Sequence, residues 1–448
     1  MPRTGGSVRV RNQTFGCIWD FAGMGRRQIM RPRRGAAGVL AGLLAISLGA
    51  GAAVAQDSND WARFPGTAYA NADPSDKAFV KEWEATPPKG YPTLSRANLA
   101  PMKAAIKRYT EIVAAGGWTP LPEVTLQHGT SHPAVALLRT RLLASGDLRE
   151  AGGNPQSFDF YVDKAVKRYQ ASNGLAPTGI VDKRTIAALN VSAASRLKQL
   201  KTNLTRLTEL SQSAAKKYVL VNIPAAQIEA VDGDRIISRH AGVVGKPDRA
   251  TPLLKSTIHE LNFNAVWHLP PTVIEKDLIP KGREMAQRGQ SVLVKYHIDA
   301  YGGDGKKLDP AKVNWSSPGA KSLTYKQQPG AENPLGFVKI NFNNSHSVYM
   351  HDTPSQALFG RNFRAASSGC VRVAGIEHLA AWILAEQGWR PEHVLHMKES
   401  GERRDVTLKK PVPLYFAYLT AWATEDGVVQ FRRDLYLKDG IGPTAAAY

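Results

Sequence analysis

The stretch "GFVKINFNNSHSVYMHD", from Gly336 to Asp352, alternates apolar and polar residues with the period of a β-strand. The alternation breaks at Asn343 and Asn344, which predict a turn between two strands. His351 therefore stands at a strand end, where an imidazole can face a cleft. The apolar positions of the two runs are Val338, Ile340, Phe342, Val348 and Met350.

Downstream, "SSGCVRV" (Ser367–Val373) holds Cys370, one of two cysteines in the 448 residues. A thiol has a pKa of about 8.5 and attacks as its thiolate, so it needs activation. His351 can supply a base, and the helical pattern expected after Cys370 would add favourable N-terminal amides. Gly369 permits a tight bend, which we expect to leave the nearby amides free for an oxyanion. Arg372 adds positive charge for a carboxylate-bearing substrate.

Other reactive chemistry has little support in the residues. His346 is expected on the opposite strand face from His351, and His378 on a solvated helix face. The chain has no Cys-x-x-Cys, no His-Glu-x-x-His and no Gly-x-Ser-x-Gly, so we expect neither a metal nor a cofactor, and no serine hydrolase. Asp352 follows His351 and points the other way, which predicts a structural salt bridge for its carboxylate.

The N-terminal part resembles an export signal. An uncharged apolar run from Gly35 to Ala55 follows an arginine cluster and ends in Ala-Val-Ala, a small-residue cleavage pattern. Cleavage would remove Cys17 and leave Cys370 alone, which in an exported protein indicates a reactive thiol. The polar and glycine neighbours of Cys370 argue against burial in an apolar core. The alternative is a retained membrane anchor. The cluster comprises Arg26, Arg27, Arg31, Arg33 and Arg34.

A formal net charge of +20 and a pI near 9.9 favour anionic partners such as cell-wall polymers. We find no nucleic-acid motif and expect no nucleic-acid partner. The periodicities divide the chain into segments, of which the fifth carries a Pro-, Gly- and Lys-rich insertion at about 270–335 that reads as a lid. They are 1–55 (signal and tail), 56–130 (helical scaffold), 131–192 (three-helix unit), 193–216 (connecting helix), 217–400 (mostly β) and 401–448 (C-terminal segment).

Two of these segments resemble known protein families. "AVKRYQASNGLAPTGIVDKRT" (165–185) resembles the three-helix peptidoglycan-binding domain of wall enzymes. "VYMHDTP" followed by "SSGCVRV" looks like the active-site signature of YkuD-type L,D-transpeptidases, and residues 100–440 are similar to their large periplasmic YcbB-like branch. The resemblance implies an α+β chain: a mostly-β YkuD-like catalytic domain with an inserted lid, beside the small helical domain and helical scaffold segments.

The resemblance also implies a reaction and its residues. Such enzymes displace the terminal D-Ala of a peptidoglycan stem peptide, hold a thioester to the third residue, and pass it to a second stem amine as a 3–3 cross-link. Cys370 would be the nucleophile and His351 the proton shuttle, with Tyr349 and Arg372 at pocket positions. A periplasmic monomer acting on stem peptides and inhibited by carbapenems is expected, meeting the membrane only through an uncleaved signal.

One position departs from the family pattern. Where the family has Ser-His-Gly-Cys, this chain has Ser367, Ser368, Gly369 and Cys370. Serine can donate a hydrogen bond but does not titrate near neutral pH. We expect Ser368 to support the oxyanion site with Gly369, because His351 already supplies a base. The alternatives are an L,D-carboxypeptidase using the same acyl-enzyme, and a non-catalytic wall-binding protein.

Overall fold

The computed structural model describes residues 92–150 and 152–442. The expected signal segment, its arginine cluster and Cys17 lie outside these residues, as does most of the first half of the expected helical scaffold at 56–130. Within the described ranges, no helix combines the length and the apolar character needed to cross a membrane.

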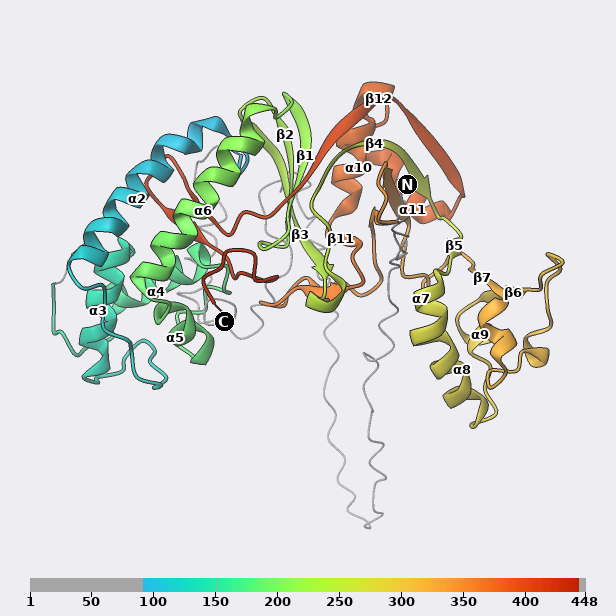
Figure 1. Cartoon of the computed structure of the whole chain (residues 1–448), viewed down its shortest axis with the longest axis horizontal. Helices are drawn as coiled ribbons and strands as arrows, with labels where there is room; N and C mark the ends of the chain where they lie inside the picture. The colour runs from blue at the N-terminus through green and yellow to red at the C-terminus, as the bar shows by residue number, and fades with distance from the viewer. Residues whose placement is uncertain (1–91, 151, 443–448) are drawn as a thin grey trace, which may run out of the picture.

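A nine-stranded sheet forms the centre of the described chain (Figure 1). Its order is β10, β3, β11, β9, β8, β4, β12, β1 and β2, and a further pairing of β2 with β3 closes the sheet on itself. Its inward side chains belong to one large apolar cluster. The strands are β1 (Lys217–Asn222), β2 (Gln227–Asp232), β3 (Arg235–Gly245), β4 (Leu254–Phe263), β8 (Val338–Phe342), β9 (Met350–His351), β10 (Ala365–Ser367), β11 (Val371–Val373) and β12 (Arg404–Ala417).

The two runs predicted from the stretch 336–352 are strands. In β8 every second side chain is buried, and β9 pairs with β8 in antiparallel register, Lys339 opposite His351. Gly336 precedes β8 with a φ of +60°, and a Cβ there would lie 2.2 Å from the Asp352 carboxylate. Glycine at 336 thus lets the two strand ends approach at the site.

The C-terminal segment is part of the nine-stranded sheet. Strand β12, inside the separately expected segment 401–448, pairs in parallel with β1 and antiparallel with β4. The boundary expected at 400 therefore cuts through the sheet. Sequence patterns reveal a strand but not its neighbours, because pairing here joins residues about two hundred positions apart. Beyond β12, the short strands β13 (Ala421–Ala423) and β14 (Val429–Phe431) pair with each other in antiparallel register.

Two long helices pack side by side against one end of the sheet (Figure 1). Their facing apolar side chains form the contact: Met102 and Tyr109 of α2 (Leu99–Ala114) are buried with Leu200 and Leu207 of α6 (Ala193–Gln212). On the chain after Cys370, α10 (Ile376–Leu384) and α11 (Pro391–Ser400) follow strand β11. The amphipathic spacing of leucine in the connecting segment thus predicts a helix that the structure contains.

The three-helix unit packs around its own apolar cluster. Its elements are α3 (Ala134–Ser145), α4 (Phe160–Ser172) and α5 (Lys183–Leu189), and Asp182 caps α5 by accepting from the Thr185 amide. The unit is fastened to the rest of the chain: Arg432 donates to the Ser172 carbonyl, and the Ala176 amide donates to Asn362. Asn362 belongs to the loop that leads from His351 towards Cys370, so the helical unit braces that loop.

The insertion at 270–335 forms a small subdomain to one side of the main sheet (Figure 1). It has its own three-stranded sheet in the order β5, β7, β6. Gly282 of α8 lies against Trp315, where a Cβ would meet the indole at 2.3 Å, so the packing there is close. Its elements are β5 (Trp267–His268), α7 (Pro271–Val273), the π-helix η3 (Ile274–Leu278), α8 (Ile279–Ala286), α9 (Val292–Lys295), β6 (Ile298–Tyr301) and β7 (Thr324–Gln327).

A buried histidine links two strands of the sheet near the site. His240 of β3 pairs through Nδ1 with the Ala374 carbonyl at 2.9 Å and through Nε2 with the Ser238 hydroxyl at 2.8 Å. Burial lowers the pKa of His240 from 6.5 to about 4. Between these two values the unfolded chain binds the proton and the folded chain does not. The stability due to neutral His240 is therefore complete above pH 6.5 and is lost towards pH 4.

We expect the urea midpoint to fall between pH 7 and pH 4.5, and to fall less in His240→Gln, which has no imidazole to protonate. His346→Gln, in an exposed turn, is the matched control and should follow the parent curve. Equilibrium unfolding followed by tryptophan fluorescence at the two pH values measures this. A His240 variant with the full pH dependence of the parent would contradict the assignment.

Candidate active site

Parallel pairing of two short strands brings the predicted catalytic residues together. Strand β11 pairs with β9 so that Arg372 lies opposite His351, and the Val371 amide donates to the Tyr349 carbonyl at 3.0 Å. Side chains alternate along extended backbone, so Tyr349 and His351 share a face with Cys370 and Arg372. The structure therefore places Cys370 and His351 as diagonal neighbours on one face of adjacent chain segments.

His351 is oriented by a backbone carbonyl. Its Nδ1 lies 2.5 Å from the Asp352 oxygen, and because a carbonyl only accepts, Nδ1 carries the proton. Its Nε2 is then an acceptor, and it is buried without a hydrogen-bond partner among the described residues. Burial, and next the Arg372 charge, lower the pKa of His351 to about 3, although the carbonyls of Asp352 and Pro334 oppose the shift. The ring is a neutral base at physiological pH.

Asp352 does not form the salt bridge that its sequence position predicted. Its carboxylate accepts a hydrogen bond from the Phe337 amide at 3.1 Å and forms no hydrogen bond with the His351 imidazole. Its carbonyl, however, does orient His351. A residue that follows a strand end can turn its backbone towards the preceding side chain, a geometry that strand alternation does not reveal.

Tyr349 and Arg372, carried over as pocket residues, both lie at the site. The Tyr349 ring stands 5.5 Å from the His351 ring, and its hydroxyl accepts from the Trp267 indole at 3.2 Å. Burial raises the pKa of Tyr349 to about 12, so the phenol stays protonated. Arg372 is only 3% exposed, and its charge acts on His351. Trp267 ties the inserted subdomain to this face.

Cys370 differs from expectation in two ways. It has no solvent-exposed surface and belongs to the main apolar cluster, so the expectation that its polar neighbours exclude burial is wrong. Those neighbours lie in the turn, whereas the chain at Cys370 enters strand β11 inside the sheet. The structure also has Cys370 in a disulfide, while the chain's other cysteine, Cys17, lies outside the described residues. A lone thiol therefore requires a chain that lacks Cys17.

The turn before Cys370 is held by its own serine. Gly369 has a φ of +115°, which glycine tolerates and other residues rarely adopt, as its expected bend requires. The Ser367 hydroxyl donates to the Cys370 carbonyl at 2.5 Å and accepts from the Gly369 amide at 3.2 Å. The Gly369 amide is thus engaged, contrary to the expectation that it is free for an oxyanion.

No helix begins beside Cys370. Strand β11 follows the cysteine, and α10 starts only at Ile376, after Gly375. The expected assistance from helix N-terminal amides is therefore wrong. The alternation of Val371, Arg372 and Val373 is the signal for a strand, and the helical pattern begins only after it.

Sequence reasoning missed two side chains that hold the cysteine turn, Arg249 and Thr251, and a third, Tyr436, that holds the loop carrying them. Arg249 donates to the Ser368 hydroxyl at 2.8 Å, and the Thr251 hydroxyl donates to the Gly369 carbonyl at 2.8 Å. The Tyr436 hydroxyl accepts from the Thr251 amide at 3.1 Å and donates to the carbonyl of Gly245. A short polar loop directly after a long strand was the available signal for the first two.

His346 and His378, the two histidines weighed against His351, are both exposed. His346 is exposed in the turn before Tyr349, which is not a strand, and His378 is exposed on α10, as expected for a solvated helix residue. Within residues 92–150 and 152–442, no group of three or more His, Cys, Asp or Glu side chains could hold a metal ion.

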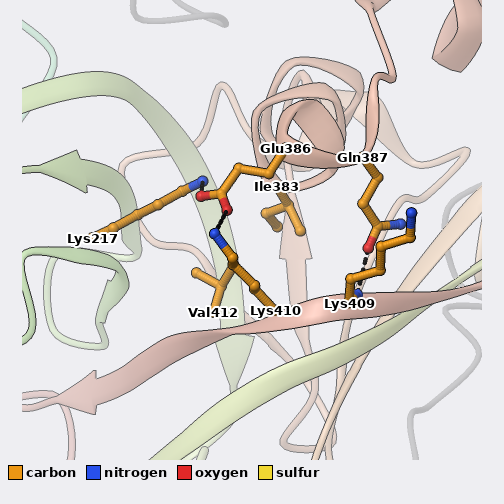
Figure 2. Close-up of a pocket in the computed structure, with 7 residues that line it drawn as sticks. All are labelled: Lys217, Ile383, Glu386, Gln387, Lys409, Lys410 and Val412. Atoms are coloured by element: carbon orange, nitrogen blue, oxygen red, sulfur yellow. Dashed lines mark hydrogen bonds and ion pairs between the residues drawn. The ribbon is translucent and has the colours of Figure 1, made fainter.

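A shallow pocket elsewhere on the surface contains none of the predicted site residues (Figure 2). Glu386 pairs there with Lys217 at 2.7 Å and with Lys410 at 3.4 Å, so one carboxylate bridges two cations. Figure 2 shows Glu386 of the 3-10 turn η7 (Ala385–Gln387) meeting Lys217 of β1 and Lys410 of β12. The pocket lining comprises Lys217, Ile383, Glu386, Gln387, Lys409, Lys410 and Val412.

The chain matches two family models. Residues 216–410 match the YkuD model, described as the L,D-transpeptidase catalytic domain, and residues 131–189 match a model described as "Putative peptidoglycan binding domain". A closed β-rich sheet with a His351–Cys370 face thus coincides with a catalytic domain of a known class. Residues 216–410 are therefore similar to the L,D-transpeptidase catalytic domain, and residues 131–189, which precede them, are similar to a peptidoglycan-binding domain.

Among individual proteins, the chain is 31% identical over 219 residues to a Haemophilus influenzae protein named "Putative L,D-transpeptidase". The match covers 49% of this chain and 44% of that protein, so it spans less than half of the relative's length.

Solved L,D-transpeptidases resemble the chain more distantly. The one from Stackebrandtia nassauensis is 14% identical, with 67% of this chain and 97% of that chain covered and a TM-score of 0.25. That of Xylanimonas cellulosilytica is 14% identical, with 67% and 100% covered and a TM-score of 0.21.

Proposed function

We propose that this protein is a periplasmic L,D-transpeptidase that forms 3–3 peptidoglycan cross-links through a thioester on Cys370. The observation that carries the proposal is the strand pairing that sets Cys370 and the unpartnered Nε2 of His351 on one face of β11 and β9. This face lies within the region that matches the L,D-transpeptidase catalytic domain. The chain's +20 charge suits a polyanionic wall.

In the first half-reaction, His351 Nε2 takes the thiol proton while the sulfur attacks the carbonyl carbon that precedes the terminal D-Ala. The carbonyl electron pair moves to oxygen and returns as the C–N bond breaks, and the same proton leaves with the D-Ala amine. A histidine with a pKa near 3 does not hold a proton at rest. The thiol is therefore deprotonated during attack rather than stored as a thiolate–imidazolium pair.

In the second half-reaction, the side-chain amine of another stem peptide attacks the thioester and the sulfur leaves. His351 accepts the amine proton and returns a proton to the sulfur. Arg372, buried beside His351, is placed to pair with a substrate carboxylate. Because Cys370 has no exposed surface, what covers it has to move aside for each substrate.

Export makes the thiol available in this proposal. A signal ending at Ala55 would be cleaved in the periplasm and would remove Cys17, which leaves one cysteine in the mature chain. The peptidoglycan-binding domain, bonded to the loop at Asn362, would hold the wall polymer near the same face.

The test uses the full chain, expressed with its leader and isolated from the periplasm. Intact mass should show loss of residues 1–55 and, after meropenem, one covalent adduct per chain on Cys370. Incubation with a disaccharide-tetrapeptide should then give the cross-linked dimer. A tripeptide product alone would mean a carboxypeptidase, and a chain without adduct or product would leave only wall binding.

A further inference from the structure

A single arginine reaches the serine that replaces the family's histidine. Arg249, in the 3-10 turn η2 (Pro247–Arg249) between β3 and β4, donates from Nη1 to the Ser368 hydroxyl oxygen at 2.8 Å. Ser368 is 1% exposed, and the Arg249 side chain is 15% exposed, so the contact is shielded from water. Shielding strengthens a charge-assisted hydrogen bond.

The loop that carries Arg249 is fastened to the cysteine turn. The Lys246 amide donates to the Ser367 carbonyl at 2.9 Å, and the Thr251 hydroxyl donates to the Gly369 carbonyl at 2.8 Å. The loop also packs tightly on β3, since a Cβ on Gly245 would lie 2.1 Å from the Arg249 carbonyl. These contacts fix the position of the Arg249 guanidinium relative to the cysteine turn.

The Ser368 hydroxyl accepts a hydrogen bond but donates none within the described residues. The Ser368 oxygen accepts from Arg249, but within the described residues no acceptor takes the proton of that hydroxyl. The neighbouring Gly369 amide is already bonded to Ser367. A hydroxyl that accepts from a cation becomes a stronger donor, because successive hydrogen bonds polarise one another.

We propose that Arg249 is a positioning residue for acyl transfer: it orients and polarises the Ser368 hydroxyl, which donates to the oxyanion that forms when Cys370 attacks. Ser368 supplies the hydrogen-bond donor and Arg249 supplies the positive charge. A protonated histidine at position 368 would combine both in one side chain. This inference rests on the proposed function, since it needs the acylation step to occur.

Charged groups surround the pair on several elements. Lys246 and the exposed Asp248 lie on the same loop, with Asp248 3.8 Å from the Arg249 Nε. Asp277 approaches from η3 of the inserted subdomain, where burial raises its pKa against the influence of Arg249 and Lys246. His351 and Arg372 belong to the strand face beside the turn. Of these, Asp277 is the group whose titration would change the field at Arg249.

The experiment measures the second-order rate of meropenem acylation of the exported mature protein between pH 5.5 and 9. Arg249→Gln should lower the rate by about 10²-fold, the loss typical of one oxyanion donor. The parent rate rises only above pH 7.5, where thiolate contributes, and Arg249→Gln should move that rise to higher pH because a cation near the developing charge is gone. Arg249→Lys should recover most of the rate, since it keeps the charge.

Ser368→Ala should lose about as much as Arg249→Gln, and the double variant should lose no more than either alone, because the two act as one unit. Arg288→Gln, an equal charge loss at a 67% exposed side chain, is the matched control.

Rates of Arg249→Gln within twofold of the parent, with an unchanged pH profile, would overturn the inference. A purely structural role would lower the melting temperature and leave the pH profile in place. A parent that meropenem does not acylate would instead overturn the proposed function, and this inference with it.

Discussion

Alanine in place of Cys370 is expected to abolish both the meropenem adduct and the cross-linked product. No other nucleophile is placed to form the thioester, so turnover should fall by a factor on the order of 10⁶, the loss seen when a nucleophile is removed. Binding of the stem peptide should survive, because Arg372 and the helical domain are unchanged. Intact-mass spectrometry and chromatography of the reaction products measure these outcomes.

Burial of Cys370 calls for a control on folding. The side chain is packed in the main apolar cluster, and deleting one sulfur there should cost about 1–2 kcal/mol of unfolding free energy. Cys370→Ser keeps the shape and should also lack activity, because a hydroxyl is a far weaker nucleophile beside a neutral imidazole. Cross-linking by a folded alanine variant would show that another residue carries the acyl group.

Glutamine in place of His351 is expected to slow acylation by about 10²–10⁴-fold near pH 7, the range for loss of a general base. The pH dependence is the sharper part of this prediction. With the pKa of His351 lowered to about 3, the parent keeps a neutral base throughout pH 5.5–7.5, so its acylation rate should change little there. The variant reacts only through the thiolate fraction, so its rate should rise about tenfold per pH unit for as long as the thiol is mostly protonated.

Asp352→Asn is the matched control for this variant. The Asp352 carboxylate contacts the Phe337 amide and not the imidazole, whereas its carbonyl holds the ring. Asparagine keeps one side-chain oxygen that can accept from the Phe337 amide, and it keeps the main-chain carbonyl that orients the imidazole. The control should therefore retain the parent's rate within a few-fold and its flat profile. A parent whose rate already rises tenfold per pH unit would mean that His351 does not serve as the base.

The sequence predicts the local parts of the site well because each depends on a few adjacent residues. Alternation up to Met350 places His351 at a strand end, and the positive φ at Gly369 follows from a bend that only glycine adopts without strain. The resemblance of "SSGCVRV" then points to Cys370 before any coordinates are known. The departure at Ser368 is equally visible in the letters, but its consequence is not.

The parts that sequence reasoning missed depend on contacts between distant residues. Arg249 and Ser368 are 119 positions apart, and nothing in the short polar loop indicates which turn it will meet. The burial of Cys370 likewise follows from the strands on either side of β11, not from the serines and glycine beside it.

The sequence alone predicts the class of fold and the strand and helix periods, and it proposes the cysteine–histidine pair, because short-range patterns and motif residues carry that information. Only the tertiary structure decided that β12 lies inside the sheet, that the Gly369 amide is taken by Ser367, and that a guanidinium meets Ser368. Those three arise when the sheet closes on itself, since closure fixes which distant backbone and side-chain groups share a hydrogen bond.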